Sequence, residues 1–225
     1  MTAIVWDKVG ERYYETGVKK GVLYPMKADG SGYDTGVAWN GLITVTESPS
    51  GAEANKLYAD DIVYGTLRSA EEFGMTIEAY TYPDEFAPCD GNYEPTPGMK
   101  VGQQPRRSFA FAYVTSKGND QTADAGYLLH IAYGCTAAPS ERSYQTINDS
   151  PEAITMSWSV ETVGVAVTGA DKPSALITLD SSKIGSTKMK TIEDSLYGTN
   201  ATDPTLLTPD DIQIILEVSG VTGQN

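Results

Sequence analysis

The chain has 225 residues, 40% of them hydrophobic, which is enough for the core of one all-β domain or two small domains. Lys and Arg number 16 against 30 Asp and Glu, so the formal net charge is −14. This balance excludes a protein that grips nucleic acid or an anionic bilayer through their phosphates. No basic start followed by an apolar run marks a signal peptide, and no window approaches the roughly 20 apolar residues of a membrane helix. We therefore expect synthesis in a reducing cytoplasm.

The first half of the chain predicts short strands joined by turns, because apolar residues alternate and Gly is frequent. Strands are expected near residues 12–16 and 22–25, and over 37–48. Residues 69–72 match the Ser-x-x-Glu pattern of a helix capping box, but Phe73, Met75 and Ile77 follow with period two. We therefore predict a turn at 69–72 and a hairpin between strands at 61–69 and 73–80.

The second half predicts further strands at 107–116, 126–137, 153–167 and 174–180. In the first of these, one face carries aromatic residues and the other carries Ala and Val. The second should place its apolar residues on one face, namely Tyr127, Leu129, Ile131, Tyr133 and Cys135. In the third, the apolar parity switches after Glu161, which indicates a bulge or bend near residue 162.

Helix signals are few. Residues 83–86 suit one short helical turn, residues 186–198 have helical apolar spacing and a closing Gly198, and residues 208–218 begin with a good helix start. The apolar run of this last segment would also suit a strand. Long loops are expected at 45–60, 88–105 and 115–125. The fold prediction is one mainly β domain, a β-sandwich or β-barrel over residues 1–225, with one or two short flanking helices.

The predicted core lies between two sheets, with the 186–198 helix against one edge. Its members are Phe73, Met75, Ile77, Phe109, Phe111, Leu129, Ile131, Met156 and Trp158.

The sequence offers no catalytic centre. Glu72 and Glu78 share a strand face but lie roughly 20 Å apart, too far for a glycosidase pair. The single histidine, His130, reads as a partly buried strand residue, because no nucleophile elbow or zinc ligand set accompanies it. We expect no enzyme activity, no cofactor and no metal.

Two further features read as ordinary structure. Cys89 and Cys135 lack metal spacing and are expected to be free thiols, although pairing stays open. The segment Asp29–Gly36 falls short of phosphate-loop and EF-hand patterns, so a glycine-rich turn is expected, with stray calcium binding by Asp29 and Asp34 as the alternative.

Several longer segments carry a resemblance to a known family. "GVKKGVLYP" (17–25), "GAEANKLYADD" (51–61), "EAYTYPDEFAPCDG" (78–91) and "LLHIAYGCTAAPSERSYQTINDSPEAITMSWSVET" (128–162) are similar to the major tail tube proteins of phages and prophages of Gram-positive bacteria. The match runs from about residue 17 to 216.

The resemblance implies a structural virion protein. Six copies would form a ring whose inner sheets close into one β-barrel, and rings would stack into the tail tube through which the genome is ejected. The implied partners are further copies of the chain, the tape-measure, tail-tip and tail-terminator proteins, and transiently double-stranded DNA. The family has no catalytic residues.

Two sets of residues follow as candidates for this role. Polar strand faces suggest a channel lining of Thr76, Glu78, Thr155, Ser157, Ser159 and Glu161, with the 61–69 strand in the same inner sheet. Residues in the long loops suggest contacts between subunits, namely Leu57, Tyr58, Tyr93, Met99, Arg106 and Arg107. We expect that reversing the two arginines to glutamates leaves the fold intact and blocks tube growth.

Two alternatives stay open at this point. One is the tube subunit of a phage-derived contractile particle that carries no DNA. The other is a β-sandwich carbohydrate-binding module, in which exposed Trp39, Tyr80 and Tyr82 would stack on sugars.

Overall fold

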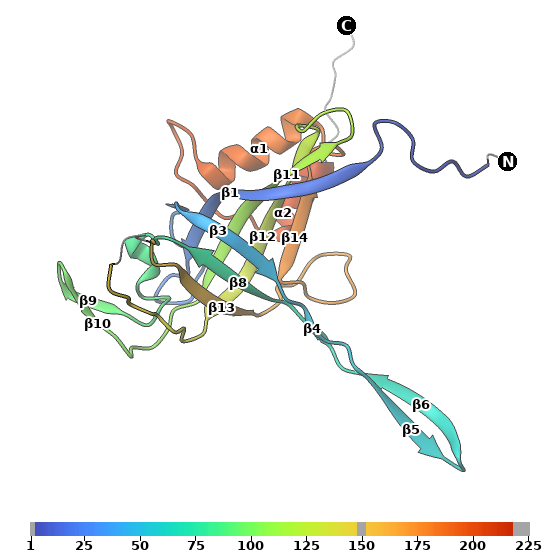
Figure 1. Ribbon diagram of the computed structural model, residues 1–225, viewed down its shortest axis with the longest axis horizontal. Helices are drawn as coiled ribbons and strands as arrows, with labels where there is room; N and C mark the ends of the chain where they lie inside the picture. Colours follow the sequence, from blue (N-terminus) through green and yellow to red (C-terminus); the bar gives the residue numbers. More distant parts are fainter. Residues whose placement is uncertain (1–2, 148–151, 218–225) are drawn as a thin grey trace, which may run out of the picture.

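The computed structural model describes residues 3–147 and 152–217, which form a mainly β molecule with 44% strand and 11% helix (Figure 1). In chain order, the strands before the first helical turn are β1 (Tyr13–Pro25), β2 (Val37–Trp39), β3 (Leu42–Glu47), β4 (Ser50–Gly51), β5 (Ala54–Ala59), β6 (Ile62–Arg68), β7 (Glu71–Glu72) and β8 (Gly74–Ala79). After the 3-10 turn η1 (Asp84–Phe86) come β9 (Tyr93–Thr96), β10 (Met99–Val101), β11 (Phe109–Asn119), β12 (Gly126–Ala137), β13 (Met156–Thr162), β14 (Leu176–Asp180), α1 (Ser186–Tyr197) and α2 (Pro209–Glu217).

One antiparallel sheet of eight strands forms the body. Its order is β2-β1-β11-β12-β13-β8-β3, and β14 pairs with the first part of β12. The sheet curves strongly, because Trp39 of the edge strand β2 lies 5.5 Å, between ring centroids, from Trp158 of β13. The curved sheet therefore encloses a core within one sheet.

Two apolar clusters fill the two faces of this sheet. The inner cluster gathers Phe86 and Trp39 with inward side chains of β8, β11 and β13. The outer cluster lies between the two helices and the strands β1, β11, β12 and β14 (Figure 1). Helix α1 contributes Met189, Ile192 and Leu196 to this cluster. Strand β11 serves both clusters, since Phe109, Phe111 and Tyr113 point inward and Ala110, Ala112 and Val114 point outward.

The predicted alternation of β11 is thus confirmed, but the prediction of one core between two sheets is wrong. Leu129 and Ile131 belong to the outer cluster, under the helices, whereas most of the other predicted members belong to the inner one. The helix α1 covers a face of the sheet and not an edge. The physical reason is that β11 and β12 are buried on both faces. When both faces of a strand are apolar, the sequence pattern does not show which face packs against which partner.

Cys135 lies on the opposite face from the one predicted. The register between β11 and β12 shifts, so that Phe109 pairs with Cys135 and Phe111 with Ala132. Gly134 takes a positive φ of 58°, and a Cβ there would meet the carbonyl oxygen of Val163 at 2.4 Å. This bulge turns Cys135 into the inner cluster.

Several predicted boundaries are also wrong. Strand β1 is continuous where two strands were expected, and the single strand expected over 37–48 is broken at Asn40–Gly41 into β2 and β3. The 61–69 segment pairs with β5 and not with the 73–80 strand, whose partners are β13 and β3. The expected turn at 69–72 contains β7 instead. The bend expected near residue 162 coincides with the end of β13.

The expected loop at 45–60 is one side of a long projecting hairpin. It leaves the body at β3 and β8, continues through β4 and β7, and ends in β5 and β6 (Figure 1). We call residues 50–72 the arm. The expected loop at 88–105 likewise contains the short hairpin β9–β10, and β11 continues to Asn119 into the third. The two helices and the turn at 84–86 are confirmed, with α1 ending directly before Gly198.

Candidate assembly surfaces

A polar face covers the outside of β3, β8 and β13. Ser157 lies opposite Glu78 and Ser159 opposite Thr76, while Trp158 and Ile77 between them point into the inner cluster. Thr44 of β3 donates a hydrogen bond of 3.0 Å to Glu78. Glu161 continues the same face and is exposed. The three strands carry no Lys or Arg, so this polar face consists of hydroxyl groups and carboxylates.

The structure therefore brings together most of the predicted channel residues. Thr76, Glu78, Ser157, Ser159 and Glu161 share one face, and exposed Thr155 lies one residue before β13. The 61–69 strand does not join them, because it belongs to the arm.

The strand β3 forms a free edge of the sheet. It pairs only with β8 among the described strands, and the hydrogen bond from Ser48 N to Gly74 O places Thr44 and Thr46 toward that partner. The backbone groups of Val45 and Glu47 consequently face away from the sheet. An edge of this kind is ready to pair with a strand of another chain.

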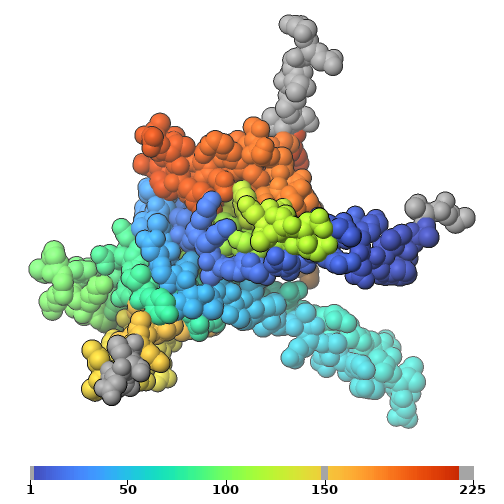
Figure 2. Space-filling view, turned by 45° about the horizontal axis from the view of Figure 1, so that its top comes forward, coloured from blue at the N-terminus to red at the C-terminus, as the bar shows by residue number. Residues whose placement is uncertain are grey.

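The arm projects from the body as a two-stranded ribbon with no core beneath it (Figures 1 and 2). Its turn residues Asp60 and Asp61 both have positive φ, as in a type I′ turn. It exposes a set of large apolar side chains, namely Leu57, Tyr58, Ile62, Val63, Tyr64 and Leu67. An isolated ribbon is marginally stable in water, so these side chains favour burial against another surface.

Two further segments expose apolar residues. Residues 3–12 extend from the body and leave Ile4, Val5, Trp6 and Val9 in solvent (Figure 1). The hairpin β9–β10 exposes Tyr93 and Met99, which were predicted to lie between subunits. With Leu57 and Tyr58 on the arm, four of the six predicted contact residues are exposed on projecting hairpins.

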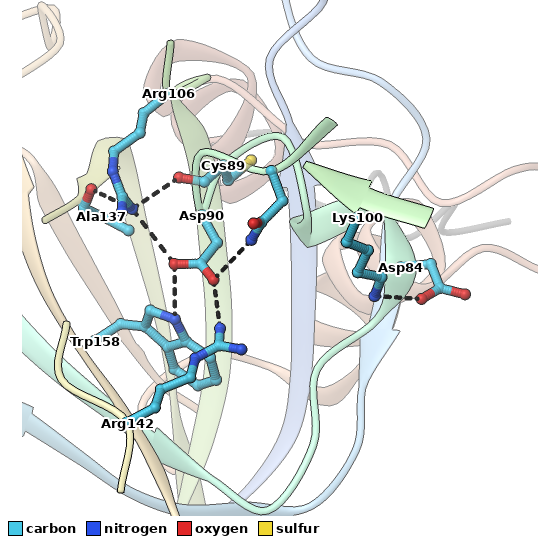
Figure 3. A network of polar contacts seen from close by, with 9 residues as sticks. Asp84, Cys89, Asp90, Lys100, Arg106, Ala137, Arg142 and Trp158 are labelled. Carbon is cyan, nitrogen blue, oxygen red and sulfur yellow. Dashed lines mark hydrogen bonds and ion pairs between the residues drawn. The ribbon is translucent and has the colours of Figure 1, made fainter. Parts of the chain in front are cut away.

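Arg106 lies in an internal network around Asp90 (Figure 3). Its guanidinium lies 3.4 Å from the Asp90 carboxylate and donates to the carbonyl oxygen of Ala137 at 3.1 Å. Gly91, with φ of 72°, allows this approach, because a Cβ there would lie 3.3 Å from Arg106 Cγ. The prediction that Arg106 lies on the contact surface is therefore wrong. Because a glutamate at 106 would face buried Asp90, we now expect that reversing Arg106 and Arg107 together disturbs the fold.

Asp90 itself is a buried carboxylate with several donors. Trp158 Nε1 donates to it at 3.2 Å and Asn92 Nδ2 at 3.2 Å, and Arg142 forms a second ion pair from the segment after β12 (Figure 3). Its side chain is 7% exposed. Sequence reasoning missed this network, because its members come from five separate segments. Arg107, by contrast, lines a groove beside Tyr93 and Pro88 and stays a candidate for contact.

His130 is buried, as predicted. Its ring stacks on Tyr113 with centroids 4.6 Å apart, and its Nε2 lies 3.0 Å from the Thr115 hydroxyl. Burial lowers the pKa of His130, and the nearby carboxylates of Glu47 and Glu15 oppose this effect without reversing it. Glu47 also accepts a hydrogen bond from Tyr113 at 2.7 Å, which ties the end of β3 to β11.

Both cysteines are free and buried. Burial raises the pKa of the Cys89 thiol to about 12 and also raises that of Cys135, so both stay protonated at neutral pH. Asp29 caps a glycine-rich turn, as expected, by accepting a hydrogen bond from Ser31 N at 2.9 Å. Within residues 3–147 and 152–217, no group of three or more His, Cys, Asp or Glu side chains is placed to hold a metal ion.

The three aromatic rings that were expected to stack on sugars do not form an exposed platform. Trp39 is 2% exposed and donates to the Thr81 carbonyl oxygen, and Tyr82 packs against Phe86 and Trp158. Only Tyr80 of the three rings is exposed. The prediction that Trp39 and Tyr82 are exposed, on which the carbohydrate-binding alternative depended, is therefore wrong.

Comparison with known proteins does not assign the chain to a family. No protein-family model and no curated protein matches the chain. Among the described helices, none is long and apolar enough to cross a membrane.

Proposed function

We propose that this protein is a structural subunit that assembles with copies of itself into a tube, in the role of a phage or prophage major tail tube protein. The observation that carries the proposal is the arm, a ribbon that exposes six large apolar side chains without a core of its own. A monomer gains little from such an extension, whereas burial between copies would stabilise it.

The polar face supports the second part of this role. A channel for double-stranded DNA must not bind phosphates, and the β3–β8–β13 face offers carboxylates and hydroxyls without a basic side chain. In the assembled tube we place Glu78 and Glu161 on the channel wall. A structure of the assembly with both carboxylates on its outer surface would contradict this placement.

The free edge of β3 supports closure between subunits. Edge pairing with the next copy would satisfy the outward backbone groups of Val45 and Glu47 and continue the sheet around a ring. Head-to-tail stacking of rings needs two different surfaces, and the arm projects from a different end of the molecule than the β9–β10 hairpin (Figure 1). The six-fold ring, the virion location and the tail partners are part of the same proposal.

Negative-stain electron microscopy of the purified protein tests the proposal, together with light scattering as concentration rises. Rings or tubes are expected from the wild type. The variant carrying both Tyr58→Ser and Tyr64→Ser should keep its thermal unfolding temperature and lose tubes, because both side chains are exposed in the monomer. A wild type that stays monomeric at every concentration overturns the proposal.

A matched control replaces an exposed apolar residue that lies outside the arm. Ile214→Ser changes an exposed residue on α2, a helix that packs on the outer cluster over β12 and β14 and so lies over other strands than those of the polar face. Tubes should persist in this control. If the tyrosine variant and the control lose tubes equally, the arm has no special part in assembly.

A further inference from the structure

The segment after β12 is attached to the body at few points. Ala138 N donates to the Ser159 carbonyl oxygen at 2.7 Å. Beyond this residue, positions 139–147 are neither helix nor strand, and they form no main-chain hydrogen bond with other described residues. A segment of this kind needs a side-chain contact to hold one position.

Arg142 provides such a contact. Its guanidinium forms an ion pair with Asp90 Oδ2 and lies over the Tyr82 ring, 5.4 Å from its centroid, and the Trp158 ring, 6.0 Å away. Figure 3 shows the guanidinium and Arg106 approaching the same carboxylate from different sides. A planar, always charged guanidinium suits a site that combines one carboxylate with aromatic faces.

We infer that Arg142 is a latch residue, which holds residues 139–147 against the end of the β-body through Asp90, Tyr82 and Trp158. The inference goes beyond assembly as such, because it assigns a positioning role to one side chain. The segment exposes Tyr144, which is 76% accessible, and Ile147, which is 82% accessible. Where the proposed function holds, the latch fixes the position in which these two side chains meet a second copy.

The fold of the β-body should not depend on Arg142, in contrast to the position of residues 139–147. After removal of Arg142, Asp90 keeps its ion pair with Arg106 and its hydrogen bonds from Trp158 and Asn92. The buried carboxylate therefore stays compensated, and the fold should survive. Loss of the latch is expected to release the segment alone.

Limited proteolysis with chymotrypsin measures this release, because Tyr144 is a cleavage site inside the segment. Arg142→Ala should speed cleavage after Tyr144 by about tenfold, the effect of losing roughly one charged hydrogen bond. Arg142→Lys should fall between the variant and the wild type, since an ammonium keeps the charge and loses the planar contact. Cleavage after Tyr64 in the arm provides an internal reference that should not change.

Lys100→Ala is the matched control. Lys100 also pairs with a carboxylate, Asp84, and lies 5.2 Å from the centroid of the same Tyr82 ring, but it belongs to β10 and not to residues 139–147. Cleavage after Tyr144 should be unchanged in this control. An unchanged rate in Arg142→Ala overturns the latch, as does an equal rise in Lys100→Ala or a parallel rise at buried sites such as Tyr113.

Assembly is then scored separately by electron microscopy. With the latch released, tubes should form more slowly than those of the wild type. Normal tube growth by a variant whose Tyr144 is cut faster limits the latch to the monomer and overturns its link to assembly. A wild type that forms no tubes overturns the proposed function, while the proteolysis result still decides the latch.

Discussion

At the scale of single residues, Trp158 joins the inner core to the polar network. It is fully buried, its ring contacts Trp39 and Phe86, and its Nε1 donates to Asp90. Trp158→Ala should lower the free energy of unfolding by about 3–5 kcal/mol, because it leaves a large cavity. Chemical denaturation of the monomer measures this loss.

The control for this substitution is Trp6→Ala, since Trp6 is 76% exposed in the extended N-terminal segment. Its effect on monomer stability should stay within about 0.5 kcal/mol. Equal losses from the two variants would contradict the assignment of Trp158 to the core.

A second residue-scale feature is the ion pair between Lys117 and Asp180, whose charged atoms lie 2.7 Å apart. Partial desolvation acts to raise the pKa of Asp180, but hydrogen bonds from Lys117 and Ser182 outweigh it and lower the pKa to about 2. Because the folded-state pKa lies below the unfolded value of about 3.9, this stabilisation is present above that value. It is lost as the pH falls from about 4 to 2.

Asp180→Asn should therefore cost stability at neutral pH, on the order of 2 kcal/mol, and almost none near pH 2. Thermal unfolding across this pH range checks the expectation. Asp171→Asn, which changes an exposed carboxylate in a loop, should leave the pH profile of the wild type in place. An Asp180→Asn profile parallel to that of the wild type would show that the ion pair contributes nothing.

At the scale of elements, the arm depends on a two-residue turn whose second position suits glycine better than aspartate. Asp60 and Asp61 have φ of 50° and 63°, a region in which Gly carries no steric cost. Asp61→Gly should stabilise the β5–β6 hairpin by about 0.5–1 kcal/mol, because Asp-Gly is a preferred type I′ sequence. Asp61→Pro should unfold the tip, because Pro fixes φ near −65°.

Hydrogen exchange of the β5 and β6 amides measures both changes in the monomer. The expected order of protection is Asp61→Gly, then wild type, then Asp61→Pro. Protection in β11, at the centre of the body, should be the same in all three. Equal protection of the arm in the three proteins would mean that its register does not depend on this turn.

At the scale of the whole molecule, the net charge of −14 sets the electrostatics of assembly. Copies that approach one another repel, and salt shortens the range of repulsion from about 30 Å at 0.01 M to about 8 Å at 0.15 M. Tube formation should therefore be faster at the higher ionic strength, as followed by light scattering. Slower assembly with added salt would show instead that ion pairs between copies dominate the contact.

The sequence by itself determined the features that depend on local pattern. Strict alternation placed Phe111 and Ala112 on opposite faces of one strand, and period two at Met75 and Ile77 outweighed the capping-box match before them. Apolar spacing and Gly198 located α1, and the distribution of Thr, Ser and Glu identified the polar face. Each of these follows from backbone geometry over a few residues.

Only the tertiary structure decided which strands pair and where charged side chains find partners. The pattern predicted that the 61–69 strand pairs with the 73–80 strand, whereas the two-residue turn at Asp60–Asp61 joins it to β5. Nothing in the sequence around Arg106 and Arg142 indicates a buried partner. Both arginines meet at Asp90 because three loops converge at one end of the curved sheet. The Arg142 contact joins residues 52 positions apart and the Trp158 contact to the same carboxylate joins residues 68 positions apart, and no local periodicity encodes such pairs.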